Sequence, residues 1–389
     1  MPEKPPSKPE PRYTPRPAIF DTASLDQFAR GSIKACFGPE YAIYDHKRAP
    51  RIPNTDLMLV SRIVEVDAAR LVTKTGSSMV AEYDVPVDMW FYRDNSSPFT
   101  PYSMLMEMAL QPCGFLSAYM GPTLAFPDID FYFRNLDGQG KLLREVDLRG
   151  RTLVNRVELL SSTVLQGIII QKYSFDMQVD GESFYTGVST FGYFTLQAFA
   201  SQAGLDRGSP PAKWHEANAG VKLAQVAGSR GAASQRRSAL ALPKDQLAFL
   251  DDALIDLHGG SAGLGYIYAT TNVDPSHWFF ACHFHDDPVM PGSLGLEAIV
   301  QAVQAYAIHA DLGRDFQSPR FGNVEGQEMV WKYRGQVLGD SQCVNVEVHI
   351  TGVQRAGGQV QVFANASLWK GSLRIYEFKN VAVSLSEAQ

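Results

Sequence analysis

The sequence predicts an α+β protein in which one structural unit, a buried helix beside an antiparallel meander of strands, occurs twice. Three observations support this fold class. Two segments about 190 residues apart share the same order of tryptophan, proline, serine, glutamate and glutamine residues. In each copy these residues begin a helix that is apolar on nearly every face, and such a helix must be buried on most sides. Long segments of alternating polar and apolar residues then end each copy.

The internal repeat can be aligned residue by residue. Trp90 and Trp278 are 188 positions apart, and the first copy lacks two residues between its tryptophan and the proline that follows. The pairs that are 190 positions apart are Pro98 and Pro288, Pro101 and Pro291, Ser103 and Ser293, Glu107 and Glu297, and Gln111 and Gln301. The offset is 188 again where 133–139 matches 321–327. Such self-similarity indicates an internal duplication.

Helix and strand boundaries follow local signals. Asp21 or Thr22 is expected to cap a short helix, and residues 57–64 and 79–87 are predicted as strands. The alternating segments predicted to form the meanders are 145–159, 163–179 and 183–196 in the first copy and 327–338, 343–353, 359–369 and 373–384 in the second. Hairpin turns are predicted at 180–181 and 370–371.

The second copy contains the pattern that indicates chemistry. The aromatic run 278–280 is expected to form a strand that delivers His283 to a turn, after which Gly292 opens a helix over about 293–311. Inside this apolar helix the sequence places one carboxyl group, Glu297. A buried acid needs a hydrogen-bonding partner or a chemical role.

A histidine, a glycine at a helix start and a helix carboxyl are the groups needed to eliminate water from a 3-hydroxyacyl thioester. His283 can remove the proton from the carbon next to the carbonyl, while a carboxylic acid protonates the departing hydroxyl. Backbone N–H groups at Gly292 and the helix N-terminus can hold the thioester oxygen as it gains negative charge. An apolar surrounding favours the protonated form of Glu297, which this role requires.

Other interpretations of these residues stay open. A lone histidine after an aromatic strand is more often structural. The cluster of Cys282, His283, His285, Asp286 and Asp287 also looks like a set of metal ligands. However, a strand would turn Cys282 and His283 to opposite faces, and a closed zinc site usually draws its ligands from two segments. The sequence offers no second ligand pair, so no metal is expected.

Four short motifs of the second copy carry a family resemblance. They are His283-Phe284, Asp287-Pro288-Val289-Met290-Pro291-Gly292, Leu294-Gly295-Leu296 and Gly335-Gln336-Val337-Leu338. With these motifs the chain resembles the bacterial 3-hydroxydecanoyl-ACP dehydratase/isomerase family. The resemblance implies a double hot dog, in which each curved antiparallel sheet wraps one central helix. It also implies that His283 is the catalytic base, that Gly292 is the oxyanion donor and that Glu297 stands at the position of the catalytic acid.

The second copy departs from the family pattern at two positions. Most close members have Asp where this chain has Glu297, and Cys where it has Ser293. Glutamate at this position is similar to the related dehydratases that do not isomerise the double bond. The expected reaction is therefore dehydration to a trans-2-enoyl thioester, and trans-2/cis-3 isomerisation stays open.

The first copy keeps Glu107 and Gln111 but has no histidine in the turn between its tryptophan and its proline. In the resembled family the site lies across a dimer interface, with the histidine from one hot dog and the acid from the other. Carried onto a duplicated chain, this predicts an intramolecular pseudo-dimer in which His283 works with Glu107. The alternative is that His283 works with Glu297. The residues expected to bind the substrate are Gln111, Gln301, Pro291 and Ser293.

The composition of the chain indicates where its domains begin and end and which kinds of partner are not expected. Residues 1–19 hold seven prolines and are expected to form a disordered tail, either a linker from a larger chain or an ordinary terminus. Residues 20–197 are expected to be a degenerate hot dog, 198–242 a surface linker and 243–389 the catalytic hot dog. The net charge of −6 argues against nucleic acid as a partner. No apolar run is long enough to span a membrane, which predicts a soluble, cytoplasmic protein.

This order of domains is similar to the dehydratase regions of bacterial polyunsaturated fatty acid synthases. That resemblance implies a substrate carried on the phosphopantetheine of an acyl carrier protein, further synthase domains as partners, and no small-molecule cofactor. Further homodimerisation stays open. Two other functions also stay open, namely a hot-dog acyl thioesterase and a non-catalytic acyl-binding scaffold.

Overall fold

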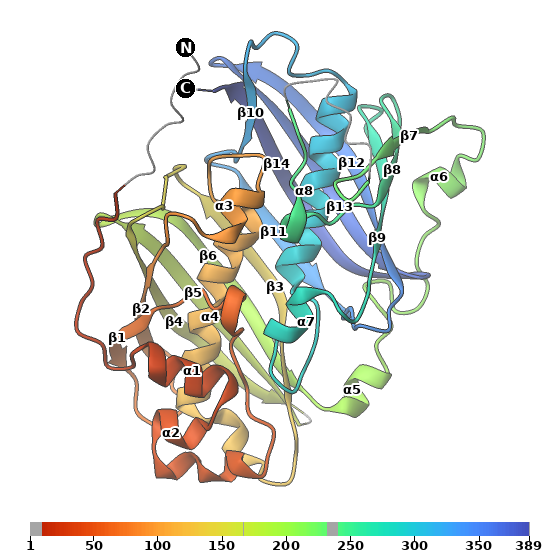
Figure 1. Cartoon of the computed structure of the whole chain (residues 1–389). Helices are drawn as coiled ribbons and strands as arrows, with labels where there is room; N and C mark the ends of the chain where they lie inside the picture. The colour runs from red at the N-terminus through yellow and green to blue at the C-terminus, as the bar shows by residue number, and fades with distance from the viewer. Residues whose placement is uncertain (1–9, 166, 232–239, 389) are drawn as a thin grey trace.

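The computed structural model describes residues 10–165, 167–231 and 240–388 (Figure 1). Two halves of similar build lie side by side. Each half has one long central helix, α4 (Tyr102–Met120) or α8 (Gly292–His309), wrapped by curved antiparallel strands. The α+β double hot dog that the sequence predicted is therefore confirmed.

The strands of both halves form one continuous antiparallel sheet. The first half contributes β1 (Arg62–Asp67), β2 (Ser78–Asp84), β3 (Tyr132–Leu142), β4 (Thr152–Leu165), β5 (Ile168–Val179) and β6 (Glu182–Phe194). The second half contributes β7 (Ala224–Ala227), β8 (Asp252–Asp256), β9 (Tyr266–Asn272), β10 (Pro319–Gly322), β11 (Glu328–Tyr333), β12 (Cys343–Ala356), β13 (Gln359–Lys370) and β14 (Leu373–Glu387). The halves join where β3 pairs with β11, so the two predicted sheets are fused edge to edge. This pairing satisfies backbone groups that two free edges would expose.

The short helices fill the ends of the two halves. They are α1 (Thr22–Arg30), α2 (Ile33–Phe37), α3 (Trp90–Asp94), α5 (Leu196–Ala200), α6 (Trp214–Ala217) and α7 (Trp278–Cys282), with 3₁₀ turns η1 (Pro39–Asp45), η2 (Thr55–Leu57), η3 (Pro122–Ala125) and η4 (Asp245–Leu247). Asp21 caps α1 by accepting a hydrogen bond from the Ser24 N–H at 2.9 Å, as predicted. Among the residues that the structure describes, no helix combines the length and apolarity needed to cross a bilayer.

The aromatic run before His283 is a helix, so the prediction of a strand is wrong. Residues 278–282 form α7, and the His283 N–H donates to the Phe279 carbonyl at 2.9 Å. The Trp278 indole packs edge-on against Trp90 of the equivalent helix α3, with ring centroids 4.9 Å apart. Aromatic residues favour strands only where packing permits, and here the contact between the halves decides the conformation.

The segment 57–64 is a strand only from Arg62 onward, because its first part finds another hydrogen-bond partner. Gln111 on α4 donates from Nε2 to the Leu57 carbonyl at 2.8 Å and accepts from the Leu59 N–H at 2.9 Å. A buried glutamine thus satisfies the backbone groups that a sheet neighbour would satisfy in a strand.

Strand β3, at the junction of the halves, was not predicted as a strand. Its sequence is poor in β-formers because aromatic rings from neighbouring strands cover it. A side chain on Gly138 would meet the Trp331 ring at 2.1 Å, and one on Gly140 would meet the Tyr185 hydroxyl at 2.3 Å. Only glycine leaves room for these rings. Because glycine is rare in strand interiors, this segment does not look like a strand from its sequence.

Parts of the predicted tail and linker are structured. In the tail, the Arg16 side chain bonds to Glu82 of β2 and to Glu65 of β1, while residues 1–9 lie outside the described part. The segment 198–242 contains α6 and β7, and β7 pairs with β8 at the edge of the sheet. Residues 232–239 of this segment also lie outside the described part.

Helix α4 contains a proline, and the structure compensates for its missing N–H. Pro112 cannot bond the Met108 carbonyl one turn earlier. Instead, Nδ2 of buried Asn155 on β4 donates to the carbonyls of Met108 and Ala109 at 3.0 and 3.1 Å. Helix α8 has Ala302 at the equivalent position, so it needs no such donor.

We therefore expect Asn155→Ala to lower the free energy of unfolding by about 1 kcal/mol, because it leaves a buried carbonyl unsatisfied. Asn345→Ala on β12 is the control, because Asn345 is only half-buried and its Nδ2 donates to the Thr270 hydroxyl at 3.2 Å rather than to a helix carbonyl. It should change stability by less than about 0.5 kcal/mol. Urea denaturation measures both. Equal losses of unfolding free energy in the two variants would contradict the idea that Asn155 compensates for the N–H that Pro112 lacks.

Candidate active site

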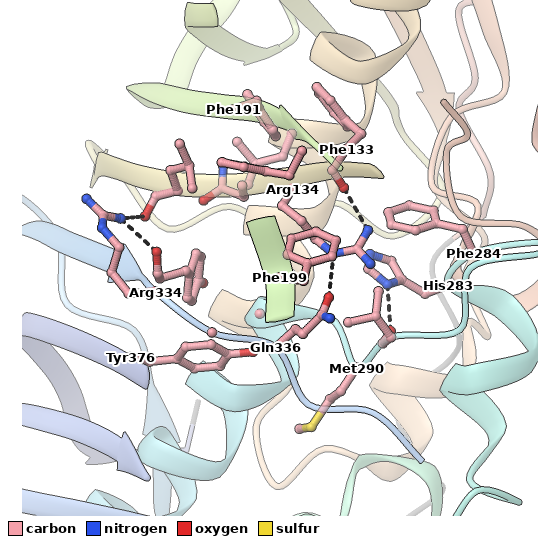
Figure 2. Close-up of a pocket in the computed structure, with 18 of the residues that line it drawn as sticks. Phe133, Arg134, Phe191, Phe199, His283, Phe284, Met290, Arg334, Gln336 and Tyr376 are labelled. Carbon is pink, nitrogen blue, oxygen red and sulfur yellow. Dashed lines mark hydrogen bonds between the residues drawn. The ribbon is translucent and has the colours of Figure 1, made fainter. Parts of the chain in front are cut away.

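A cavity of about 400 Å³ lies between the two halves of the chain. The first half lines it with one face of α4 and with residues of β3, β5, β6 and the segment around α5. The second half lines it with the loop after α7, the start of α8, and residues of and after β11. Figure 2 shows residues of both halves facing this space. Apolar and aromatic side chains form most of the wall, with a few polar groups among them.

His283 is held at the end of α7 with a defined tautomer. Its Nδ1 lies 2.8 Å from the Val289 carbonyl (Figure 2). A carbonyl can only accept, so Nδ1 carries the proton and Nε2 keeps its lone pair. Burial, aided by the nearby guanidinium of Arg134, lowers the pKa of His283 to about 4. At neutral pH the imidazole is therefore uncharged and can accept a proton.

The loop that carries His283 is anchored by residues of the other half. Arg134 of β3 donates to both carboxylate oxygens of Asp287, at 2.7 and 2.8 Å. It also donates to Gln336 Oε1 at 3.1 Å (Figure 2). At the start of the loop, the Cys282 carbonyl accepts from the backbone and side-chain N–H groups of Asn54, each at 3.0 Å. The first half thus positions the histidine of the second.

Glu107 projects from α4 into the same cavity. Its Oε1 accepts from the Ser293 hydroxyl at 2.6 Å, and its Oε2 accepts from Gln111 Nε2 at 3.1 Å. Burial raises the pKa of Glu107 above its ordinary value. Since desolvation penalises the charged form, the carboxyl is biased toward the protonated state that a general acid needs.

Glu297 lies outside this cavity. It lines a separate space of about 30 Å³ together with Asn95 of the first half. Its oxygens accept from the Ser103 hydroxyl at 2.6 Å and from Gln301 Nε2 at 2.8 Å, and burial raises its pKa as well. Gln301 supports Glu297 as Gln111 supports Glu107. The structure therefore brings His283 together with Glu107 and keeps Glu297 apart.

Asn95 occupies the position in the first copy that His283 occupies in the second. Its Nδ2 donates to the Phe99 carbonyl at 3.0 Å, just as His283 Nδ1 bonds Val289. The amide keeps the bond that shapes the turn, but it offers no basic nitrogen. The smaller space beside Glu297 therefore lacks a proton acceptor equivalent to His283.

Gly292 opens α8 at the cavity wall, and Pro291 is the N-cap residue before it. A side chain on Gly292 would come within 2.6 Å of the Tyr333 ring, so only glycine fits this contact. The first N–H groups of a helix have no partner within it, and they carry partial positive charge. The N–H groups of Gly292 and Ser293 are thus candidates for holding a carbonyl oxygen.

Two features of this site were not predicted from the sequence. One is the Arg134–Asp287 ion pair, and the other is the aromatic wall formed by Phe133 and Phe191, whose rings stack at 4.9 Å (Figure 2). Arg134 lies in the segment 133–139, which the sequence analysis matched to the second copy but did not connect with a function. Within the described ranges, no group of three histidine, cysteine, aspartate or glutamate side chains converges as a metal site.

Comparison with known proteins agrees with the fold and the motifs. Residues 242–379 match the family model described as the FabA-like domain. The second half is a FabA-like domain. Over 97% of its length, the chain is 35% identical to a protein of Thraustochytrium sp. that is described as part of a polyunsaturated fatty acid synthase. It spans 26% of the length of that protein.

Solved structures resemble the chain only distantly. The dehydratase domain from the CurJ module of curacin polyketide synthase is 8% identical, with a TM-score of 0.44 over 85% of this chain and 98% of that one. A protein described as an oleoyl thioesterase from Lactobacillus plantarum is 10% identical, with a TM-score of 0.46 over 81% and 98%. These similarities do not distinguish between functions. The functions are distinguished instead by the geometry of the site between the FabA-like domain and the first half.

We expect Arg134→Gln to lower the free energy of unfolding by about 3 kcal/mol, because it leaves the mostly buried Asp287 carboxylate unpaired. It should also raise the pKa of His283 above about 4, since a neighbouring positive charge is lost. Urea denaturation and NMR titration of the histidine measure these effects.

Arg355→Gln is the control, because it removes the arginine of an exposed ion pair with Asp315. It should cost less than about 1 kcal/mol. If Arg134→Gln behaves like Arg355→Gln, Arg134 does not anchor the histidine loop.

Proposed function

We propose that the chain dehydrates 3-hydroxyacyl thioesters to trans-2-enoyl thioesters, with His283 as the base and Glu107 as the acid. The observation that carries this proposal is the shared cavity. A neutral imidazole from one half and a buried carboxyl from the other face the same apolar space, whereas Glu297 faces a different one.

The proposed reaction uses both groups once per turnover. Nε2 of His283 removes the proton from the carbon next to the thioester carbonyl, and the carbonyl oxygen gains negative charge. The N–H groups at the start of α8 stabilise that charge. The bond to the 3-hydroxyl then breaks as Glu107 supplies its proton, so water and the enoyl thioester are released. Transfer of the proton from His283 back to Glu107 through water restores both groups.

Ser293 and Gln111 act as positioning residues in this proposal. Their hydrogen bonds hold both carboxyl oxygens of Glu107, and Gln111 is itself fixed by two backbone groups. Holding the acid in one orientation lowers the entropic cost of reaching the transition state. Pro291 fixes the start of α8 and thus the direction of its N–H groups.

The substrate that we propose is an acyl chain tethered by phosphopantetheine to an acyl carrier protein. Support comes from the similarity to part of a polyunsaturated fatty acid synthase and from the apolar cavity wall. Other synthase domains are the proposed partners. The reaction balances without a cofactor, because the proton and the hydroxyl that leave the substrate form water.

A thioesterase would use the same carboxyl differently. Hydrolysis by a helix carboxylate needs the ionised form to activate water, and burial favours the neutral form of Glu107. The burial of Glu107 thus favours elimination over hydrolysis. Isomerisation of the double bond would need a second proton transfer at the same site, and product analysis for a cis-3-enoyl thioester tests it.

Glu107→Gln should slow single-turnover dehydration of a 3-hydroxyacyl thioester by roughly 10²–10⁴-fold, because the amide cannot donate the acid's proton. Glu297→Gln is the matched control at the equivalent position and should change the rate little. Formation of the enoyl thioester provides the measurement. Loss of activity only in Glu297→Gln would mean that the second half holds its own acid. A free acid as the only product would support the thioesterase.

The rate should also depend on pH in a defined direction. The base works when neutral, so kcat/KM should fall as pH decreases through about 4, where His283 becomes protonated. The acid works when protonated, so the rate should fall at high pH, above a pKa of Glu107 that is raised from its ordinary value. A pH profile of the unmutated enzyme measures both limbs. An acid limb centred near the ordinary histidine pKa would contradict the buried base.

A further inference from the structure

One residue of α4 differs between the wall of the large cavity and the wall of the small one. Gly114 lies two turns beyond Glu107 and lines the large cavity. An added Cβ would point between Phe133 and Ile52, at 3.3 Å from a ring carbon of Phe133 and 3.8 Å from a methyl of Ile52. Both of these side chains also line the cavity. The missing side chain of Gly114 thus lets the Phe133 ring pack close to the helix, and any side chain here would push that ring toward the cavity.

The duplication supplies an internal comparison for this position. The residue 190 positions after Gly114 is Gln304 on α8, and its side chain lines the small space beside Glu297. Likewise, Tyr102 stands 190 positions before Gly292 and lines that same small space. Where the large cavity has two glycines, the small one has two long side chains. The volumes of the two spaces are about 400 and 30 Å³.

We propose that Gly114 sets the length of acyl chain that the site accepts, an inference that rests on the proposed dehydratase function. The reacting carbons lie between His283 and Glu107, and the wall from Glu107 to Gly114 follows one face of α4. Seven residues of helix span about 10 Å, which is the reach of a medium-length acyl chain. The tail of such a chain runs along the wall that Ile52 and Phe133 form, and a side chain at position 114 would push Phe133 into its path.

The experiment compares kcat/KM for the thioesters of 3-hydroxybutyrate and 3-hydroxydodecanoate. For Gly114→Leu we expect the short substrate to react within about threefold of the unmutated rate. The long substrate should lose about a hundredfold, because several of its methylenes no longer find an apolar wall. Gln304→Leu places the same residue at the equivalent position of α8 and should leave the ratio of the two rates unchanged.

Gly114→Ala keeps the proposal testable if the leucine variant does not fold. It adds one carbon, which Phe133 accommodates by a shift of a few tenths of an ångström, and it should lower the long-to-short ratio severalfold. An unchanged ratio in the folded Gly114 variants would overturn the inference and leave the dehydratase intact. An equal change in Gln304→Leu would overturn it too. If the unmutated chain dehydrates neither substrate, the proposed function itself fails, and that result precedes any variant.

Discussion

The crossed hydrogen bonds between the two central helices are the constraint on which the rest of the structure depends. Each helix carries one buried glutamate, and each glutamate accepts from a serine at the start of the opposite helix, at 2.6 Å in both cases. A buried carboxyl without such donors would be costly. The pairing therefore requires the two helices to meet near their N-terminal ends. This contact places Glu107 beside the first turn of α8, where unpaired N–H groups are concentrated.

The duplicated scaffold separates structural from chemical roles. Both copies keep the glutamate, the supporting glutamine and the serine, because these residues satisfy buried polar groups in either half. The turn before each helix also keeps its side-chain bond to a carbonyl, made by His283 in one copy and by Asn95 in the other. What the first copy lacks is the basic nitrogen. Hydrogen bonding therefore constrains both halves, whereas the proton transfer that we propose would constrain only the half that carries His283.

Sequence patterns predicted the features that depend on local periodicity. The apolar central helices, the long alternating strands and the repeated Glu107 and Glu297 all follow from spacing along the chain. Three features depend instead on contacts between distant segments. Trp90 packs edge-on against Trp278 where the aromatic run forms a helix, the ring of Trp331 requires glycine in β3, and Arg134 pairs with Asp287 of the other half. The residues in each of these contacts are far apart in the sequence, so local sequence patterns do not predict them.

Fusion of the two halves also changes what cavities the protein must maintain. In a symmetric dimer of one unit, any glycine that opens one site opens both, and each empty apolar space reduces stability in proportion to its volume. In the fused chain the two positions vary independently. Tyr102 and Gln304 line the small space beside Glu297, while Gly292 and Gly114 line the large cavity. The large cavity thus takes its walls from both halves, and the copy without an equivalent of His283 contributes Glu107 and Arg134 to it.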